Sequence, residues 1–141
     1  MYGALNISTS GMIAQRTRMN VISANIANAD AITNQNGEAA PYRRKFALLA
    51  PGGKDGPMGV SVLKIGEDDG PFRKVFDPDN PFAAVKTDAS KDQVEGYVNY
   101  PNVNPVVEMV NLVEASRAYE ANVMASQASK AMFDAAMQLI A

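Results

Sequence analysis

The sequence has 141 residues and a formal net charge of −2. It is therefore sized for one ordinary domain and lacks the positive charge expected of a protein that binds nucleic acid or an anionic membrane. It contains no Cys and no His, which excludes disulfides and removes the commonest general base and transition-metal ligand. No stretch approaches the roughly 20 apolar residues of a membrane span, and we expect no cleaved signal peptide because the first residues form neither a basic nor an apolar leader.

The first predicted element is an amphipathic helix over residues 4–28. Its apolar positions recur at intervals that suit one helix face, and they are Leu5, Met12, Met19, Ile22 and Ile26. Gly11 weakens the prediction, because glycine inside a helix costs about 1 kcal/mol relative to alanine. The helix is expected to end at residues 28–30, where Asn and Asp favour caps and turns.

The middle of the chain differs in composition from the two ends. It holds every proline except Pro105, and Asn36-Gly37 is a strong signal for a tight turn. The Pro/Gly-rich run over 51–57 is predicted to be a loop. Short, partly alternating runs predict β-strands over 42–49, 60–65, 72–76 and 94–100. We therefore expect a small β-rich insert between two helices.

The last predicted element is a long helix over 105–141, with Asn104 as its N-cap and Pro105 at its first position. Steps of three and four define one seam, which consists of Met109, Leu112, Ser116, Tyr119, Val123, Ser126, Lys130, Phe133, Met137 and Ile140. About 37 residues at about 1.5 Å each give a rod of about 55 Å, longer than the core of so small a chain. We therefore expect another chain to cover the seam; the alternative is a closed monomer in which the two helices pair only with each other.

Two pairs of carboxylates, Asp68–Asp69 and Asp77–Asp79, are the candidates for acid/base chemistry, which needs two carboxylates in contrasting environments. They stand in Pro/Gly-rich segments, where turn formation is the ordinary explanation. The basic run over 43–45 is expected to form a solvated or salt-bridged strand face. We predict no catalytic, cofactor or metal site, and an unrelated carboxylate-dependent enzyme is the remote alternative.

Four segments carry a resemblance to a known family. Residues 20–30 (NVISANIANAD) resemble the N-terminal signature shared by bacterial flagellar rod and hook proteins, and residues 41–44 (PYRR) look like the middle segment of that family. Residues 96–105 (GYVNYPNVNP) and 108–123 (EMVNLVEASRAYEANV) are similar to the segment that leads into the C-terminal helix of proximal rod proteins. The short insert also favours the proximal rod, with another rod subunit of the same family as the alternative. Residues 66–93 match least well.

The resemblance implies a structural subunit of the flagellar basal-body rod, the drive shaft that crosses the periplasm, transmits motor torque and encloses the export channel. It implies a coiled-coil-like helical domain made of residues 1–29 and 105–141, with the β-rich and loop insert over 30–104. The implied partners are other copies of the chain, the rod proteins FlgB, FlgF and FlgG, the rod–ring adaptor FliE and the flagellar type III export apparatus. No enzyme activity, cofactor, nucleic acid or membrane span is implied, and export proceeds without a cleaved signal peptide.

The resemblance also assigns residues to roles. Within and between subunits, the stripe Leu5, Met12, Met19, Ile22 and Ile26 is expected to face Met109, Leu112, Tyr119, Val123, Phe133, Met137 and Ile140. The turns out of and back into the helical tube are assigned to Asn25, Asn28, Asp30, Tyr100, Pro101, Asn102, Asn104 and Pro105, chiefly through hydrogen bonds from side chain to backbone.

Overall fold

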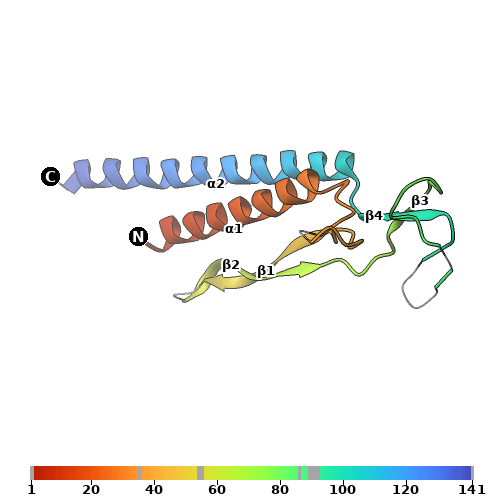
Figure 1. Ribbon diagram of the computed structural model, residues 1–141. Helices are drawn as coiled ribbons and strands as arrows, with labels where there is room; N and C mark the ends of the chain where they lie inside the picture. Colours follow the sequence, from red (N-terminus) through yellow and green to blue (C-terminus); the bar gives the residue numbers. More distant parts are fainter. Residues whose placement is uncertain (1, 35, 54–55, 86, 89–92, 141) are drawn as a thin grey trace.

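The computed structural model describes residues 2–34, 36–53, 56–85, 87–88 and 93–140. Two long helices, α1 (Tyr2–Ala27) and α2 (Pro105–Ile140), begin and end the described chain. Between them lie the strands β1 (Lys45–Gly53), β2 (Gly56–Glu67), β3 (Arg73–Phe76) and β4 (Tyr97–Tyr100). The predicted fold class, mainly α-helical with a small β-rich insert, is confirmed at this level (Figure 1).

The two helices run antiparallel and side by side, and α2 extends beyond the N-terminal end of α1 (Figure 1). Their bounds agree with the predicted helices to within two residues. Gly11 does not interrupt α1, and the structure gives a reason for a glycine there. A Cβ atom at position 11 would lie 2.7 Å from the side-chain oxygen of Asn122 on α2. Gly11 therefore lowers helix propensity but permits a close approach of the two helices.

The strands β1 and β2 form an antiparallel hairpin that packs along α1 (Figure 1). Phe46 pairs with Gly66 across the hairpin, and a Cβ atom on that glycine would lie 2.8 Å from the phenyl ring, so the ring covers the glycine. The register shifts between Leu48 and Leu49, which marks a β-bulge in a two-stranded sheet.

The predicted loop over 51–57 is wrong at 51–53 and 56–57, and its centre at 54–55 lies outside the described residues. β1 continues to Gly53, and β2 already begins at Gly56. Pro51 pairs with Val60, which is compatible with a strand because each strand of a two-stranded sheet has a free edge that needs no N–H donor. Gly52 takes a φ of 92° at the second register shift, a value that glycine adopts without strain.

The strands β3 and β4 form a second antiparallel pair, in which the rings of Phe76 and Tyr97 meet edge to face with centroids 5.2 Å apart. The predicted tight turn at residues 36–37 is confirmed. Gly37 has a φ of 80°, and the side-chain oxygen of Asn34 accepts the backbone N–H groups of Asn36 and Glu38.

The apolar core is small and lies mainly where the helices meet the insert. Its buried members are Ala14, Val21, Ile22, Ala29, Val98, Val103 and Ala115. The far ends of both helices contribute none of them. The best-packed part of the described chain is therefore this meeting point, which we call the junction.

Candidate assembly interface

The contact between α1 and α2 has a well-defined register. Three facing pairs set it, and they are Asn25–Glu108, Arg18–Glu114 and Gly11–Asn122. In each pair the residue numbers add up to 132 or 133, as expected for two straight antiparallel helices. The side of α2 turned toward α1 consists of Glu108, Leu112, Ala115, Tyr119, Asn122 and Ser126, all buried or half-buried. This stripe shares Leu112, Tyr119 and Ser126 with the predicted seam but has Glu108, Ala115 and Asn122 in place of Met109, Ser116 and Val123.

The residues predicted to form the assembly interface fall into three groups. Ile22 is buried. The half-buried group consists of Leu5, Met12, Met19, Ile26, Leu112, Tyr119 and Val123. The exposed group consists of Met109, Phe133 and Met137. The side chain of Ile140 lies outside the part of the chain that the structure describes. In a single chain, the exposed side chains of Met109, Phe133 and Met137 are free to contact another molecule.

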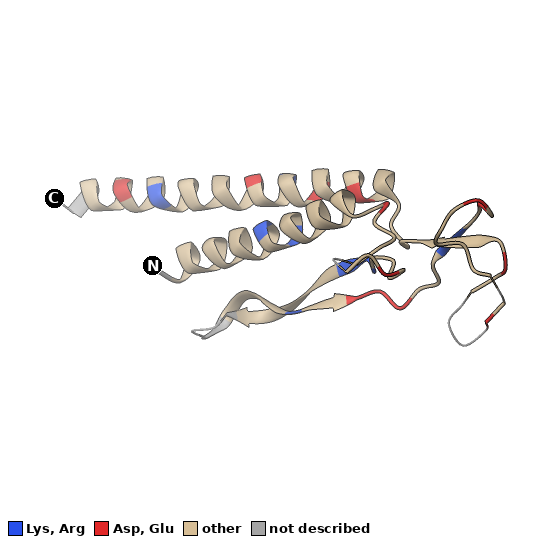
Figure 2. Ribbon diagram, viewed as in Figure 1, with Lys and Arg blue, Asp and Glu red and all other residues tan. Residues whose placement is uncertain are grey.

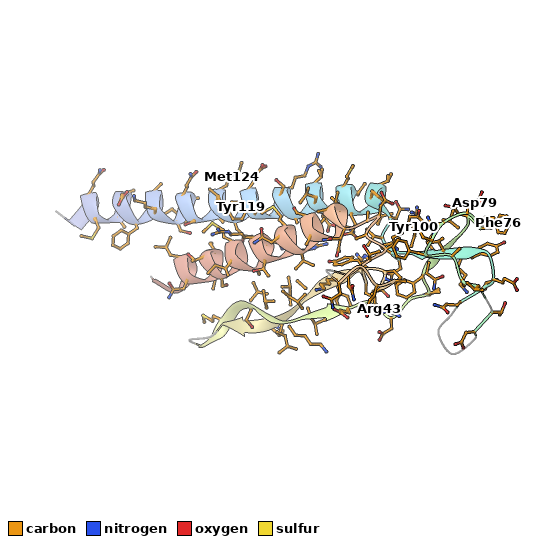
Figure 3. The ribbon with its side chains drawn as sticks, viewed as in Figure 1. Arg43, Phe76, Asp79, Tyr100, Tyr119 and Met124 are labelled. Carbon is orange, nitrogen blue, oxygen red and sulfur yellow. The ribbon has the colours of Figure 1, made fainter. Side chains whose placement is uncertain are left out.

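The side of α2 that faces away from α1 is also apolar. Figure 3 shows Tyr119 on the side toward α1 and Met124 on the opposite side. The exposed apolar side chains away from α1 include Val106, Val107, Val110, Val113, Met124 and Met132. Charged residues are sparse along the helix (Figure 2). This apolar surface is interrupted by the exposed charged residues Glu114, Arg117 and Glu120. It is most continuous over residues 106–113, where α1 covers only the opposite side of the helix.

A buried polar cluster holds the junction together. Glu108 is 1% exposed and Asn25 is 0% exposed. One carboxylate oxygen of Glu108 accepts a hydrogen bond from Nε of Arg44 at 2.8 Å, and the other accepts one from Nδ2 of Asn25 at 3.1 Å. The Asn25 side chain also pairs with the backbone of Lys45, donating to its carbonyl at 2.8 Å and accepting from its N–H at 2.9 Å. One side chain of α1 thereby binds both α2 and the first residue of β1.

Tyr42 completes this cluster from the segment before β1. Its hydroxyl donates a hydrogen bond to Oδ1 of Asn25 at 3.1 Å. Burial raises the pKa of Tyr42 above its ordinary value, and the negative charges of Glu67 and Glu108 raise it further. The hydroxyl is therefore held in its protonated, donating form. The neutral phenol suits this position because a phenolate would place a second negative charge near Glu108.

Asn102 and Asp68 connect the cluster to the outer part of the insert. Oδ1 of Asn102 accepts the backbone N–H of Arg44 at 2.9 Å, and its Nδ2 donates to the carbonyl of Asp68 at 3.3 Å. The Asp68 carboxylate lies 3.8 Å from the Arg44 guanidinium. Arg43 donates to the carbonyls of Asp68 and Gly70, and its guanidinium stacks 4.4 Å from the ring centroid of Phe72. Arg44 and Lys45 form ion pairs, but the predicted strand face is wrong for Arg43 and Arg44, because β1 begins only at Lys45.

The remaining predicted turn residues lie around this cluster. Asn28 donates to the carbonyl of Ala24, and Asp30 pairs with Arg73 at 3.3 Å. The side chain of Asn104 accepts the N–H groups of Val106 and Val107 and so caps α2, which begins at Pro105. The Arg73 guanidinium lies 5.2 Å from the ring centroid of Tyr100, and Pro101 is buried.

The candidate catalytic carboxylates do not converge on a site. Oδ1 of Asp68 accepts the N–H of Gly70, and a carboxylate oxygen of Asp77 accepts a hydrogen bond from Asn80, so both side chains stabilise turns. Asp69 and Asp79 are exposed. Within the described ranges, no three His, Cys, Asp or Glu side chains are grouped closely enough to hold a metal ion. The helices described here do not have the length and apolar composition needed to cross a membrane.

Sequence reasoning missed the centre of the junction. It assigns no role to Glu108 and pairs Arg44 with no residue. The available signal was an isolated Glu within the apolar run over 105–113, opposite a predicted strand that carries three adjacent basic residues. A charge inside an apolar stripe is rarely buried without a partner, which makes one of those basic residues its natural counterpart.

Comparison with protein families places both helices in one class. A family model described as "Flagella basal body rod protein" matches residues 5–34, and one described as "Flagellar basal body rod FlgEFG protein C-terminal" matches residues 94–139. These spans contain most of α1 and most of α2, together with β4 and the residues that cap α2. The class defined by these two helical segments is that of flagellar basal-body rod proteins.

The similarity to one member of this class extends over nearly the whole chain. The flagellar basal-body rod protein FlgC of Bacillus subtilis is 41% identical over 98% of this chain and 97% of the relative. FlgC of Borreliella burgdorferi is 36% identical over 99% and 97%, and FlgC of Escherichia coli O157:H7 is 40% identical over 90% and 88%. The chain belongs to the FlgC family and is a structural subunit of the proximal flagellar rod.

Proposed function

We propose that the chain assembles helically with other copies of itself and with other rod subunits into a tube that encloses the export channel. In this assembly α1 and α2 pack in a coiled-coil-like manner within and between subunits. The tube crosses the periplasm and transmits motor torque. Many helix contacts act in parallel, so that no single contact needs to be strong.

The observation that carries this proposal is the apolar surface of α2 on both sides. One side packs against α1 through the stripe that contains Leu112 and Tyr119. The other side exposes side chains such as Val106 and Val110, which are 69% and 64% exposed. The exposed apolar side chains over residues 106–113 form a patch of the kind that marks a protein interface. The half-buried Val123 and the exposed Met109 lie at the borders between the two sides, where a neighbouring helix would complete the packing.

The division of the chain follows from the same reasoning. Residues 1–29 and 105–141 supply the helices of the tube, and residues 30–104 form the insert on its outside. The Glu108 cluster fixes how the insert leaves the helix pair, because Asn25 of α1 hydrogen-bonds the backbone of Lys45 and Glu108 of α2 accepts a hydrogen bond from Arg44. The proposed neighbours are the rod proteins FlgB, FlgF and FlgG and the adaptor FliE, and the proposed route of delivery is the flagellar type III export apparatus.

The test places one charge on the proposed packing surface in living cells. Met109→Asp and Val123→Asp each replace the native residue in the source bacterium, and the matched control is Val85→Asp, whose side chain is 83% exposed on the insert. We expect the first two variants to be absent from purified basal bodies and to abolish swimming, because a buried unpaired carboxylate is costly. The control is expected to assemble. Normal incorporation of the Met109 and Val123 variants would refute the assigned surface.

A further inference from the structure

The β1–β2 hairpin is attached to α1 by hydrogen bonds at two points. At its base, the side chain of Asn25 forms two hydrogen bonds with the backbone of Lys45, at 2.8 and 2.9 Å. Toward its tip, Oγ of Ser10 accepts the backbone N–H of Val60 at 3.1 Å. The two points are about 22 Å apart along α1, and β1 spans about 20 Å from Lys45 to Pro51, the partner of Val60. The hairpin therefore runs along the helix from one attachment to the other (Figure 1).

The attachment at the base is firm. Asn25 is fully buried, and its side-chain amide also donates a hydrogen bond to Glu108 on α2. Pulling Lys45 away would leave buried polar atoms of Asn25 without partners, which costs more than the net value of one hydrogen bond. The base of the hairpin is therefore fixed to the helix pair.

The attachment toward the tip is weak. It is a single neutral hydrogen bond, and the Ser10 hydroxyl also donates to the carbonyl of Ile7 within its own helix, at 2.7 Å. If the strand moved away, Ser10 would keep that partner and the N–H of Val60 would bind water, so little free energy would be lost. The close approach depends on Gly59, where a Cβ atom would lie 2.5 Å from the Ser10 oxygen.

Between the two attachments, the hairpin and α1 are not closely packed. An open hollow separates them, lined by Thr17 and Val21 on the helix and by Lys45 and Ile65 on the hairpin. The side chain of Ile65 is 52% exposed although it lines this hollow. Apolar packing in this part of the contact therefore adds little to the two polar attachments.

A β-bulge divides the hairpin between its firm and its weak attachment. The register shift between Leu48 and Leu49 leaves Leu63 of β2 without a partner on β1. A bulge interrupts the ladder of cross-strand hydrogen bonds and lets the strands bend. We call the part beyond the bulge, residues 49–53 and 56–62, the strap.

We propose that the strap is a hinged element that opens away from α1 at the Ser10 contact while the base of the hairpin stays attached at Asn25. Opening uncovers one side of α1. Ala14 and Thr17 follow Ser10 at helical steps of four and seven, so they lie on that side. Ala14 is 1% exposed in the closed form. The motion takes place within one chain and does not depend on how chains assemble.

The absence of native cysteine allows a single thiol to report the opening. Ala14→Cys places the thiol on the side of α1 that the strap covers. The matched control, Ala115→Cys, replaces an equally buried alanine on the side of α2 that faces α1. The rate of reaction with the thiol reagent DTNB is measured for each folded chain, and circular dichroism verifies its helix content. Thr17→Cys is a second sensor for the case that Ala14→Cys does not fold.

Local opening predicts that the thiol at position 14 reacts about tenfold faster than the thiol at position 115. Adding Ser10→Ala should accelerate the reaction at position 14 about fivefold and leave that at position 115 unchanged. Thr9→Ala is the matched control for this substitution, because the exposed Thr9 hydroxyl also donates to a carbonyl of α1 and should have no effect.

Equal rates at positions 14 and 115 would overturn the inference, since both thiols would then be exposed by unfolding of the whole chain. An unchanged rate at position 14 in the Ser10→Ala variant would also overturn it, since Ser10 would then not hold the strap closed.

Discussion

Glu108→Ala tests whether the junction cluster holds the helices and the insert together. The substitution removes the acceptor of two hydrogen bonds, one of them from the Arg44 guanidinium at 2.8 Å. Removing one partner of a buried ion pair costs about 3–5 kcal/mol. The Arg44 side chain is 28% exposed to solvent and also lies 3.8 Å from the Asp68 carboxylate. We therefore expect a loss of stability at the lower end of that range, about 3 kcal/mol.

The matched control is Glu114→Ala on the same helix. Glu114 also pairs with an arginine, Arg18, at 3.4 Å, but its side chain is 66% exposed, so its loss is expected to cost less than about 1 kcal/mol. Both variants gain the same helix propensity. Urea unfolding followed by circular dichroism measures the difference: with a slope of about 2 kcal/mol per molar urea, Glu108→Ala lowers the midpoint by about 1.5 M. Equal shifts for the two variants would refute the role assigned to the cluster.

Three further predictions follow from single contacts. The raised pKa of Tyr42 means that the native state favours the neutral phenol, so its contribution to stability is present below pH 10 and is lost as the pH rises through the folded-state pKa. In urea titrations above pH 10, the Tyr42→Phe variant should therefore lose less stability than the native chain. Parallel curves of stability against pH for the two proteins would contradict this. Gly11→Ala alone should bring no gain in stability, because its Cβ atom would lie 2.7 Å from the side-chain oxygen of Asn122. In an Asn122→Ala background, which lacks that oxygen, the same substitution should add about 1 kcal/mol. A gain in both backgrounds would contradict the close approach of the helices. Amide hydrogen exchange of the isolated chain should show strong protection near residues 20–27 and 108–116 and weak protection at the far ends of both helices. Strong protection at those far ends would contradict their need for neighbours.

The helices could be predicted from the sequence because their signals are local and long. Asn104 and Pro105 mark the start of α2, and apolar spacing sustained over many turns defines both helices. The side on which α2 meets α1 was less predictable. Glu108, Ala115 and Asn122 lie there in place of more apolar neighbours, because small and polar side chains allow a close approach and pair with Gly11 and Asn25. Hydrophobic periodicity alone assigns such positions to the outside.

The β1–β2 hairpin shows a different limit. Its Pro- and Gly-rich end was predicted to be a loop, since these residues usually interrupt strands. In the structure Pro51 pairs with Val60 at a free edge, and Gly52 adopts a positive φ at a shift in register. Whether a proline interrupts a strand depends on which edge it occupies, and the sequence does not state this.

The junction depends on contacts between residues far apart in the chain. Asn25, Arg44 and Glu108 belong to α1, β1 and α2, and only the folded arrangement brings them together. The Asn25 and Asn102 positions were singled out through the family resemblance, but their partners were not. Local sequence patterns predict helices and strands well. They predict polar partners on different elements poorly, because hydrogen bonds between elements do not follow a repeating spacing in the sequence.

The most direct test of the central claim is quantitative mass spectrometry of hook–basal bodies purified from the source bacterium. The account predicts this chain in every preparation at a few copies per rod, fewer than the distal rod subunits, with loss of the Met109→Asp variant from the same fraction. Intact basal bodies that contain none of the chain would contradict its role as a proximal rod subunit.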